Sequence, residues 1–353
     1  MIFDRDRLKQ AVAALAERGV FIGTSSWKYP GWRGQLYDEN RYVRRGRFAE
    51  SRFERLCLAE YAEVFKTVCV DAAYYKFPSQ PYLEGLTAQV PADFRFSFKV
   101  TDEITIKRFA NLPRFGVRAG RVNENFLNAE LFATAFLDPC GPFREHIGLL
   151  LFEFSHFSAG DFPRGRDFVA ALDRFLGQLP KGWRYGVEIR NRNFLHPDYF
   201  AVLARHDVAH LYNSWADMPP VGEQLDLPGS RTTPAFCGAR FLLKPGRRYE
   251  EAVKLFSPYR EIKEPYLEGR AAAARLIKQA VAAGVKTKTF EAFSKPCRSR
   301  RKEAQTSRKT ETPHVVSYSF ERAFFIYVNN RFEGNAPGTI TAVLAEAGEL
   351  PNH

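Results

Sequence analysis

Four charged residues stand at the ends of apolar segments, where a parallel sheet would bring them together. Asp71 lies in the predicted strand 67–73, Lys99 lies near the end of 94–100, and Glu188 and Arg190 stand two apart at the end of 185–189. Residues two apart in a strand face the same way. A carboxylate held by an arginine can act as a general base or as part of an anion clamp. An inward lysine can bind phosphate or attack a carbonyl group. These four are the candidate catalytic residues.

Each of these groups also has a purely structural interpretation. Glu188 and Arg190 could form an ion pair that closes one layer of a barrel. Lys99 could pair with Asp71 or Glu188 as a neutralised core charge. Both alternatives stay open at the level of the sequence.

A second group of candidates follows the apolar run 323–328, which is typical of a buried strand. Asn335 stands where a helix N-cap would be, after a turn that contains Gly334, and Pro337 falls in the first helical turn. A helix N-terminus offers free N–H groups to an anion, and Arg331 adds positive charge. Asn330, Arg331, Gly334 and Asn335 are therefore candidate substrate-binding residues. The alternative is a capped turn without a ligand.

Aromatic and amide side chains complete the candidate substrate site. Trp27 and Tyr75 follow the first two predicted strands, and Asn213 ends the sixth. Aromatic rings can stack on a base or a sugar, although rings at loop roots are more often loop anchors.

The spacing of the histidines and cysteines gives little support for a metal site or for redox chemistry. The seven histidines show no paired ligand spacing, and the five cysteines are widely spaced without a Cys-x-x-Cys pair. The sequence predicts no cofactor, with a single Mg²⁺-like ion on Asp71, Glu153 and Glu188 as the alternative. The cysteines show no disulfide pattern, and the sequence has neither a signal peptide nor an apolar run of membrane-spanning length. These features predict a cytoplasmic protein that does not enter a membrane.

Strands and helices alternate along the chain. The predicted strands are 21–26, 67–73, 94–100, 147–154, 185–189, 208–213, 239–244 and 323–329. The predicted helices are 8–18, 52–65, 80–90, 124–137, 166–179, 197–206, 249–255, 265–283 and 339–347. This order favours an α/β fold, a single (β/α)₈ TIM-type barrel over 21–353 with an extra helix in 1–20 and long loops. A doubly wound sheet is the alternative, but the turn after the first strand is not a dinucleotide fingerprint.

Several motifs together resemble a known family. They are Gly23-Thr-Ser-Ser-Trp-Lys-Tyr, Asp71-Ala-Ala-Tyr-Tyr-Lys-Phe-Pro, Phe96-Ser-Phe-Lys-Val, His146-Ile-Gly-Leu-Leu-Leu-Phe, Val187-Glu-Ile-Arg-Asn and Asn329-Asn-Arg-Phe-Glu-Gly-Asn-Ala. In this order they are similar to the domain of unknown function 72 (YecE-like) family, from about residue 21 to 344. The resemblance implies a TIM barrel and brings no reaction with it. The chain departs from the usual pattern at Cys69, at Ile106 and at 242–246.

The positive charge is concentrated in one stretch. Residues 286–309 carry nine lysines and arginines against two glutamates, so +7 of the chain's net +12 lies there. This basic stretch is part of a predicted loop insertion at 286–321. Its positive charge would attract a polyanion such as a nucleic acid. The alternative is a solvated loop that binds nothing. A second arginine cluster lies between residues 41 and 55, partly offset by nearby carboxylates.

Three functions fit these observations. The first is an enzyme, of a hydrolase or phosphodiesterase type, on a phosphorylated small molecule or a nucleic acid at the C-terminal barrel mouth. The second is an enzyme on a small sugar-like or carbonyl substrate, with Lys99 and Glu188 as its reactive groups. The third is a nucleic-acid-binding module without catalysis. The sequence leaves the choice, and the oligomeric state, open.

Overall fold

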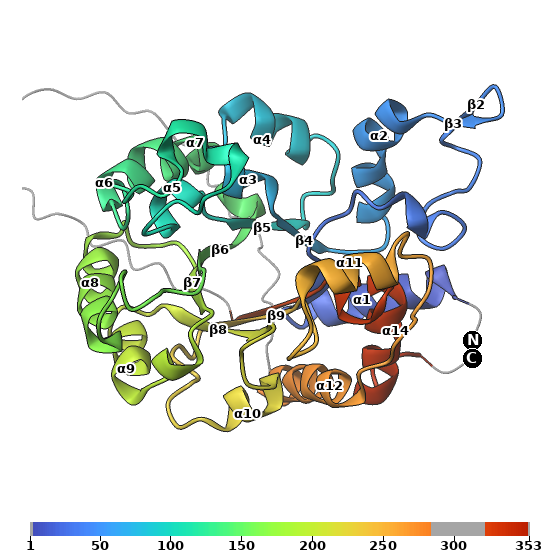
Figure 1. Cartoon of the computed structure of the whole chain (residues 1–353). Coiled ribbons are helices and arrows are strands. Elements are labelled where there is room, and N and C mark those ends of the chain that lie inside the picture. Colours follow the sequence, from blue (N-terminus) through green and yellow to red (C-terminus); the bar gives the residue numbers. More distant parts are fainter. Residues whose placement is uncertain (1–2, 284–321, 352–353) are drawn as a thin grey trace, which may run out of the picture.

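The chain forms a closed barrel of eight parallel strands inside a ring of helices (Figure 1). The structure is a computed structural model that describes residues 3–283 and 322–351. Its barrel strands are β1 (Val20–Thr24), β4 (Thr67–Val70), β5 (Arg95–Lys99), β6 (Ile147–Phe154), β7 (Tyr185–Ile189), β8 (Ala209–Ser214), β9 (Phe236–Phe241) and β10 (Ala323–Val328). The TIM-type barrel predicted from the sequence is confirmed.

The strands follow the chain order around the barrel, β1-β10-β9-β8-β7-β6-β5-β4, and Thr24 beside Val68 closes the ring. Helices cover the outside, because each crossover between parallel strands packs a helix back onto the sheet. The longer ones are α1 (Arg5–Glu17), α2 (Glu50–Ala62), α4 (Gln80–Thr87), α8 (Gly165–Gln178), α9 (Pro197–Arg205), α11 (Tyr249–Phe256), α12 (Leu267–Ala282) and α14 (Ala336–Ala347).

Shorter helices lie mainly in the connections. They are α3 (Ala72–Tyr75), α5 (Asp102–Thr105), α6 (Ala129–Leu131), α7 (Asp138–Cys140), α10 (Val221–Asp226) and α13 (Asn330–Glu333). The expected extra helix before the first strand is α1, whose N-cap Asp4 accepts a hydrogen bond from the backbone N–H of Arg7. A small two-stranded sheet, β2 (Val43–Arg44) and β3 (Arg47–Phe48), stands apart from the barrel in the connection between β1 and α2.

Alternating residues of the strands divide the core in two. Inward side chains such as Leu149, Leu151, Leu211 and Phe325 fill the barrel, while the outward ones pack against the helices. Glycines make room in the crowded interior: a Cβ on Gly238 would lie 2.5 Å from a methyl carbon of Leu211.

Three predicted elements differ from the structure. The seventh strand ends at Phe241 instead of 244, so Lys244 lies beyond it and Arg240 is its last inward residue. The second strand ends at Val70, because Asp71 begins the short helix α3. The helix expected at 124–137 starts only at Ala129 and continues as a π-helix over Phe132–Leu137.

Three further expectations concern membrane spans, the cysteines and the basic stretch. No helix of the described part is long and apolar enough to cross a membrane. The described cysteines, Cys57, Cys69, Cys140 and Cys237, are buried free thiols. The basic stretch 286–309 lies outside the described residues.

Candidate active site at the barrel mouth

Two carboxylates lie side by side inside the C-terminal end of the barrel. Glu153 of β6 and Glu188 of β7 are register partners, and their exposed fractions are only 2% and 0%. Neighbouring like charges away from water repel each other strongly. Their burial therefore requires cations at the same level of the barrel.

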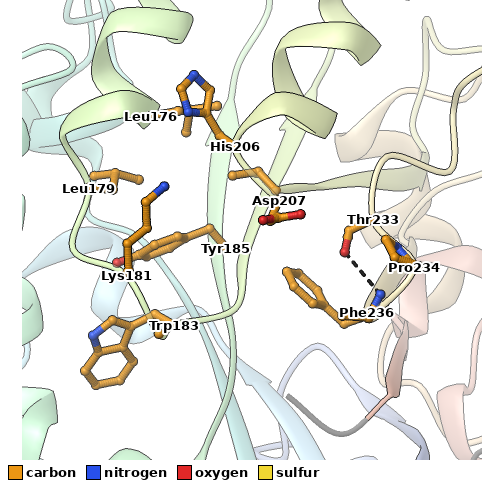
Figure 2. Close-up of a pocket in the computed structure, with 13 residues that line it drawn as sticks. Leu176, Leu179, Lys181, Trp183, Tyr185, His206, Asp207, Thr233, Pro234 and Phe236 are labelled. Atoms are coloured by element: carbon orange, nitrogen blue, oxygen red, sulfur yellow. Dashed lines mark hydrogen bonds between the residues drawn. The ribbon is translucent and has the colours of Figure 1, made fainter. Parts of the chain in front are cut away.

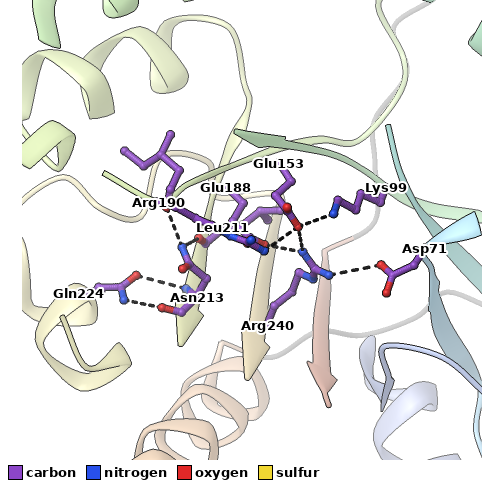
Figure 3. A network of polar contacts seen from close by, with 10 residues as sticks. Asp71, Lys99, Glu153, Glu188, Arg190, Leu211, Asn213, Gln224 and Arg240 are labelled. Atoms are coloured by element: carbon purple, nitrogen blue, oxygen red, sulfur yellow. Dashed lines mark hydrogen bonds and ion pairs between the residues drawn. The ribbon is translucent and has the colours of Figure 1, made fainter. Parts of the chain in front are cut away.

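Three cations meet this requirement (Figure 3). Glu153 Oε2 lies 2.9 Å from Lys99 Nζ and 2.8 Å from both Arg190 Nη2 and Arg240 Nη1. Glu188 accepts hydrogen bonds at Oε1 from Arg190, at 3.1 and 3.2 Å, and at Oε2 from Arg240, at 2.8 Å. The five side chains form one buried network, which we call the ion network.

The network shifts the pKa values of two of its members, Glu153 and Arg240. Burial by itself raises the pKa of Glu153, but Arg190, Lys99 and Arg240 outweigh it and hold that pKa well below its usual range. Burial lowers the pKa of Arg240, yet the neighbouring Glu188, Cys69, Glu153 and Asp71 raise it well above the ordinary value. Glu153 is therefore a permanent negative charge that holds cations, and it is a poor general base.

A cavity of about 260 Å³ opens above the network. We call it the mouth cavity. Its lining consists of Asp71, Tyr74, Tyr75, Lys99, Arg114, Glu153, Ser155, Arg190, Trp215, Arg240, Leu242, Tyr249, Asn329 and Arg331. Five of these side chains are cationic and two are carboxylates, so the lining carries an excess of positive charge that favours an anion.

Aromatic rings hold several of the cations without neutralising them. Lys99 Nζ lies 3.6 Å from the ring centroid of Tyr74, and the guanidinium of Arg190 lies 3.7 Å from that of Trp215. The guanidinium of Arg331 lies 4.5 Å from the ring centroid of Tyr249. A ring face attracts a cation but carries no net charge, so the cations keep their attraction for an anionic ligand.

Arg331 and Asp71 differ from the ion network in their freedom. No described carboxylate forms an ion pair with Arg331, although it lines the cavity. The side chain of Asp71 is 39% exposed, and its nearest cation contact, with Arg240 Nη2, is long at 3.5 Å. Asp71 is thus the carboxylate of this cavity that a ligand can reach.

The structure brings about half of the candidate residues together. Asp71, Tyr75, Lys99, Arg190 and Arg331 line one cavity, although they come from four separate strand ends. Glu188 lies below them, fully buried, and does not line it.

The turn at Gly334 and Asn335 does not offer an anion site, because its polar groups are already used. Asn335 Oδ1 caps α14 by accepting from the Gly338 N–H at 2.7 Å, and its amide donates to Gln35 and Tyr259. Gly334, at φ 114°, packs against the backbone of Glu261.

Three other candidates also serve the fold. Asn330 is fully buried and accepts at Oδ1 from Trp32 Nε1 and from the Ala336 N–H. The Asn213 amide donates to the Ile189 carbonyl at 3.1 Å, and Trp27 is 6% exposed within the core. None of the three lines the mouth cavity.

The sequence reasoning missed Arg240 as a site residue, because it placed the seventh strand three residues too late. The alternation in Phe236-Cys-Gly-Ala-Arg-Phe, with Phe236, Gly238 and Arg240 on one face, is the signal that could have found it. Arg114 and Tyr249 lie in or beyond long loops, and no local pattern marks them, whereas Trp215 directly follows β8.

The alternative of a Mg²⁺-like ion does not fit these side chains. In the described ranges, no three His, Cys, Asp or Glu side chains are grouped so that they could hold a metal ion. Glu153 and Glu188 already receive ammonium and guanidinium donors. Asp71 alone would be a weak site, since hard cations require several oxygen ligands.

A larger cavity, of about 430 Å³, lies at the opposite end of the barrel (Figure 2). It is lined by residues around the N-terminal ends of β7, β8 and β9, among them Trp183, Tyr185 and Phe236. Its histidine, His206, is bound to Asp173 at 2.6 Å. TIM barrels place their reacting groups at the C-terminal end, so the mouth cavity is the better candidate.

Comparison with known proteins identifies relatives over nearly the whole chain. The model of the family described as "Protein of unknown function DUF72" matches residues 21–352. The UPF0759 protein YecE of Escherichia coli strain K12 is 27% identical over 183 residues, and the YecE protein of strain O157:H7 matches equally. This alignment covers 52% of the chain and 50% of each relative, so the chain spans about half the length of the curated relatives it matches.

Solved structures support the fold. A DUF72 family protein from Enterococcus faecalis V583 superposes with a TM-score of 0.58 at 15% identity, covering 95% of this chain and 97% of the other. A DUF72 family protein from Thermotoga maritima MSB8 superposes with a TM-score of 0.50 at 16% identity, covering 93% and 99%. At such identities the likeness extends to the fold alone.

Proposed function

The chain belongs to the DUF72 family, a family described as of unknown function, and we propose from its cavity that it is an enzyme acting on a phosphate-bearing substrate at the barrel mouth. The observation that carries this proposal is Arg331, a cation without an ion-pair partner among the described residues, which shares one cavity with Lys99 and Arg190. Guanidinium and ammonium groups that converge on one space are the usual means of binding phosphate oxygens.

The ion network explains how these cations can be held in place before the substrate binds. Glu153 and Glu188 fix Lys99, Arg190 and Arg240 from below, so their upper faces turn toward the cavity with little freedom. Preorganised charges of this kind stabilise a developing negative charge without further rearrangement. Glu153 and Glu188 are therefore positioning residues.

Asp71 supplies the acid–base function in this proposal. In hydrolysis of a phosphate ester, its carboxylate takes a proton from the attacking water, whose oxygen bonds to phosphorus. The ester P–O bond breaks, and the leaving oxygen receives a proton from the solvent or from Lys99. Its exposure and its long contact with Arg240 leave Asp71 free for this role.

The size of the cavity limits the substrate. About 260 Å³ lies below the range of roughly 300–1,000 Å³ typical of pockets for drug-sized ligands. A phosphoryl group with its adjoining sugar or alcohol fits this space better than a large cofactor. A nucleic acid could present one of its units here.

The test compares Arg331→Gln with the exposed surface variant Arg174→Gln. We expect Arg331→Gln to weaken binding of inorganic phosphate by about 10- to 100-fold, because a hydrogen bond to a charged group contributes about 1.5–3 kcal/mol. Its thermal midpoint should stay close to that of the native protein, since no ion pair is lost. Isothermal titration calorimetry and thermal unfolding give the two readouts, and equal phosphate binding by both variants would refute the proposal.

Turnover separates an enzyme from a binding module. The native protein should hydrolyse para-nitrophenyl phosphate or its bis-ester, and Asp71→Asn should lose turnover while it keeps phosphate binding. Phosphate binding without turnover of any ester would favour the non-catalytic alternative.

The alternative of a sugar-like or carbonyl substrate has weaker support. Lys99, the nucleophile of that alternative, has its Nζ held 2.9 Å from a carboxylate oxygen of Glu153 and 3.6 Å from the ring centroid of Tyr74, so it is not free to approach a carbonyl carbon. Glu188, the base of that alternative, is fully buried with both oxygens in ion pairs.

A further inference from the structure

The short sheet in the connection between β1 and α2 has an unusual composition. Its strands, β2 and β3, pair antiparallel with Val43 opposite Phe48 and Arg44 opposite Arg47. Arg45 and Gly46 form the two-residue turn between them. We call residues 43–48 the arginine hairpin. In Figure 1 it lies apart from the barrel, beside the N-terminal end of α2.

Two features of the hairpin are unfavourable for its own stability. Arg44 and Arg47 are direct cross-strand partners, and like charges in this position destabilise a hairpin. Arg45 has φ 51°, a left-handed conformation that asparagine or glycine adopts more easily in such a turn. Three arginines therefore stand at positions where their charge or their backbone conformation destabilises the hairpin.

Nothing in the described part of the chain neutralises these groups. Arg44, Arg45 and Arg47 are exposed, and none of them forms an ion pair with a described carboxylate. Arg52 and Arg55 on the adjacent helix α2 are exposed as well, near Glu50 and Glu54. The hairpin therefore presents a positive surface that an anion from outside can reach.

The base of the hairpin is well anchored. The ring of Phe48 lies 5.6 Å from that of Phe53 on α2, and the guanidinium of Arg33 lies 4.5 Å from the Phe48 ring. The Ala49 N–H donates to the Tyr42 carbonyl at 2.8 Å, and Tyr42 is fully buried. A fixed base with a charged tip is suited to binding, because little order has to be gained on association.

We propose that the arginine hairpin binds the phosphate backbone of a nucleic acid, without regard to base sequence. All six basic residues between positions 41 and 55 are arginines, and none is a lysine. Arginine, unlike lysine, can bind a phosphate group through two parallel hydrogen bonds. A single nucleic-acid strand carries one charge per roughly 3.4 Å, which suits several guanidinium groups close together.

The position of the hairpin relates it to the mouth cavity. It follows β1, and the connections that follow barrel strands lie at the C-terminal end, where the mouth cavity opens. A nucleic-acid strand bound by the hairpin would therefore lie on the face of the barrel that carries the proposed active site. The inference adds a partner to the proposed function without depending on it, since backbone binding requires no chemistry in the cavity.

The test is a titration of a fluorescein-labelled single-stranded DNA of about 20 nucleotides with the full chain, followed by fluorescence anisotropy at several salt concentrations. The variant is R44Q/R45Q/R47Q. The matched control, K9Q/R174Q/K278Q, removes the same charge from exposed positions on α1, α8 and α12. For three lost phosphate contacts, the slope of log K against log salt should become shallower by about 2, at about 0.7 per contact.

The control variant should keep a slope close to the native one, and R44Q/R45Q/R47Q should bind inorganic phosphate in the mouth cavity as the native protein does, because none of the three arginines lines that cavity. Equal loss in the hairpin variant and the control would overturn the proposal, as would no measurable DNA binding at low salt. Competition by polyglutamate as effective as that by unlabelled DNA, at equal charge concentration, would assign the surface to an acidic peptide instead.

A single substitution separates binding from stability. Arg45→Asn keeps a residue that tolerates the left-handed turn and removes one guanidinium. We expect a thermal midpoint equal to or above the native value together with several-fold weaker DNA binding. A lower midpoint with unchanged DNA affinity would mean that Arg45 serves the fold, and the proposal would fail.

Discussion

Replacing Glu153 by glutamine tests whether the ion network holds the mouth of the barrel together. Glutamine has nearly the same shape, so it leaves no cavity, but it removes the charge that faces three cations at 2.8–2.9 Å. Lys99 loses its ion-pair partner within the described part of the chain, and Arg190 and Arg240 keep only Glu188 and the distant Asp71.

The expected cost follows from the burial of the network. Glu153 is 2% exposed, and breaking a buried ion pair by removing one partner costs about 3–5 kcal/mol of unfolding free energy. For a domain of this size, such a loss lowers the thermal midpoint by about 5–15 °C. The control is Asp226→Asn, which breaks the exposed surface pair with Arg275 and should cost at most about 1 kcal/mol.

The dependence on pH gives a second readout. The pKa of Glu153 in the folded protein lies well below its ordinary value of 4.5, so the carboxylate contributes its full stability above pH 4.5. That contribution declines as the pH falls below 4.5 toward the folded pKa, because the unfolded chain then takes up the proton first. The difference between native protein and Glu153→Gln should therefore be constant from pH 5 to 8 and shrink below pH 4.5.

The assay is urea-induced unfolding of both variants and the native protein across this pH range, followed by circular dichroism. A Glu153→Gln variant as stable as Asp226→Asn at pH 7 would refute the reasoning, because the network would then contribute no more than a surface pair. A difference that grows toward low pH would contradict the sign of the pKa shift.

Two other substitutions test local features. Burial lowers the pKa of His210 to about 3, whereas the unfolded chain keeps the ordinary value of 6.5. The unfolded state therefore takes up a proton first, and the free energy of unfolding falls as the pH drops from 6.5 toward 3. His210→Phe should flatten this part of the pH profile of urea unfolding, and an unchanged slope would contradict the argument. Gly334→Ala should cost more than about 1 kcal/mol in urea unfolding, because φ is 114° and the new Cβ would lie 2.6 Å from the Glu261 carbonyl oxygen. Its control, Gly85→Ala in α4, meets nothing within 4 Å and should be neutral or stabilising, and equal effects at the two glycines would refute the argument.

The sequence by itself determined the barrel and part of its site. The alternation of short apolar runs with amphipathic segments depends on local periodicity, so eight strands and their order could be predicted with small errors at the ends. A barrel gathers the residues at strand ends, and for that reason Asp71, Lys99, Arg190 and Arg331 could be expected to share one mouth.

The partners of these residues depended on the tertiary structure. Lys99 pairs with Glu153 instead of Asp71 or Glu188, since barrel curvature and strand register decide which side chains meet. Arg240 contacts Glu153 across 87 positions of the chain, a relation that no local pattern encodes. Loop packing decided the rest, because loop conformation follows from contacts made far away in sequence. It brought Tyr249 to the cavity, and it buried Asn330 and Asn335 in hydrogen bonds with distant segments.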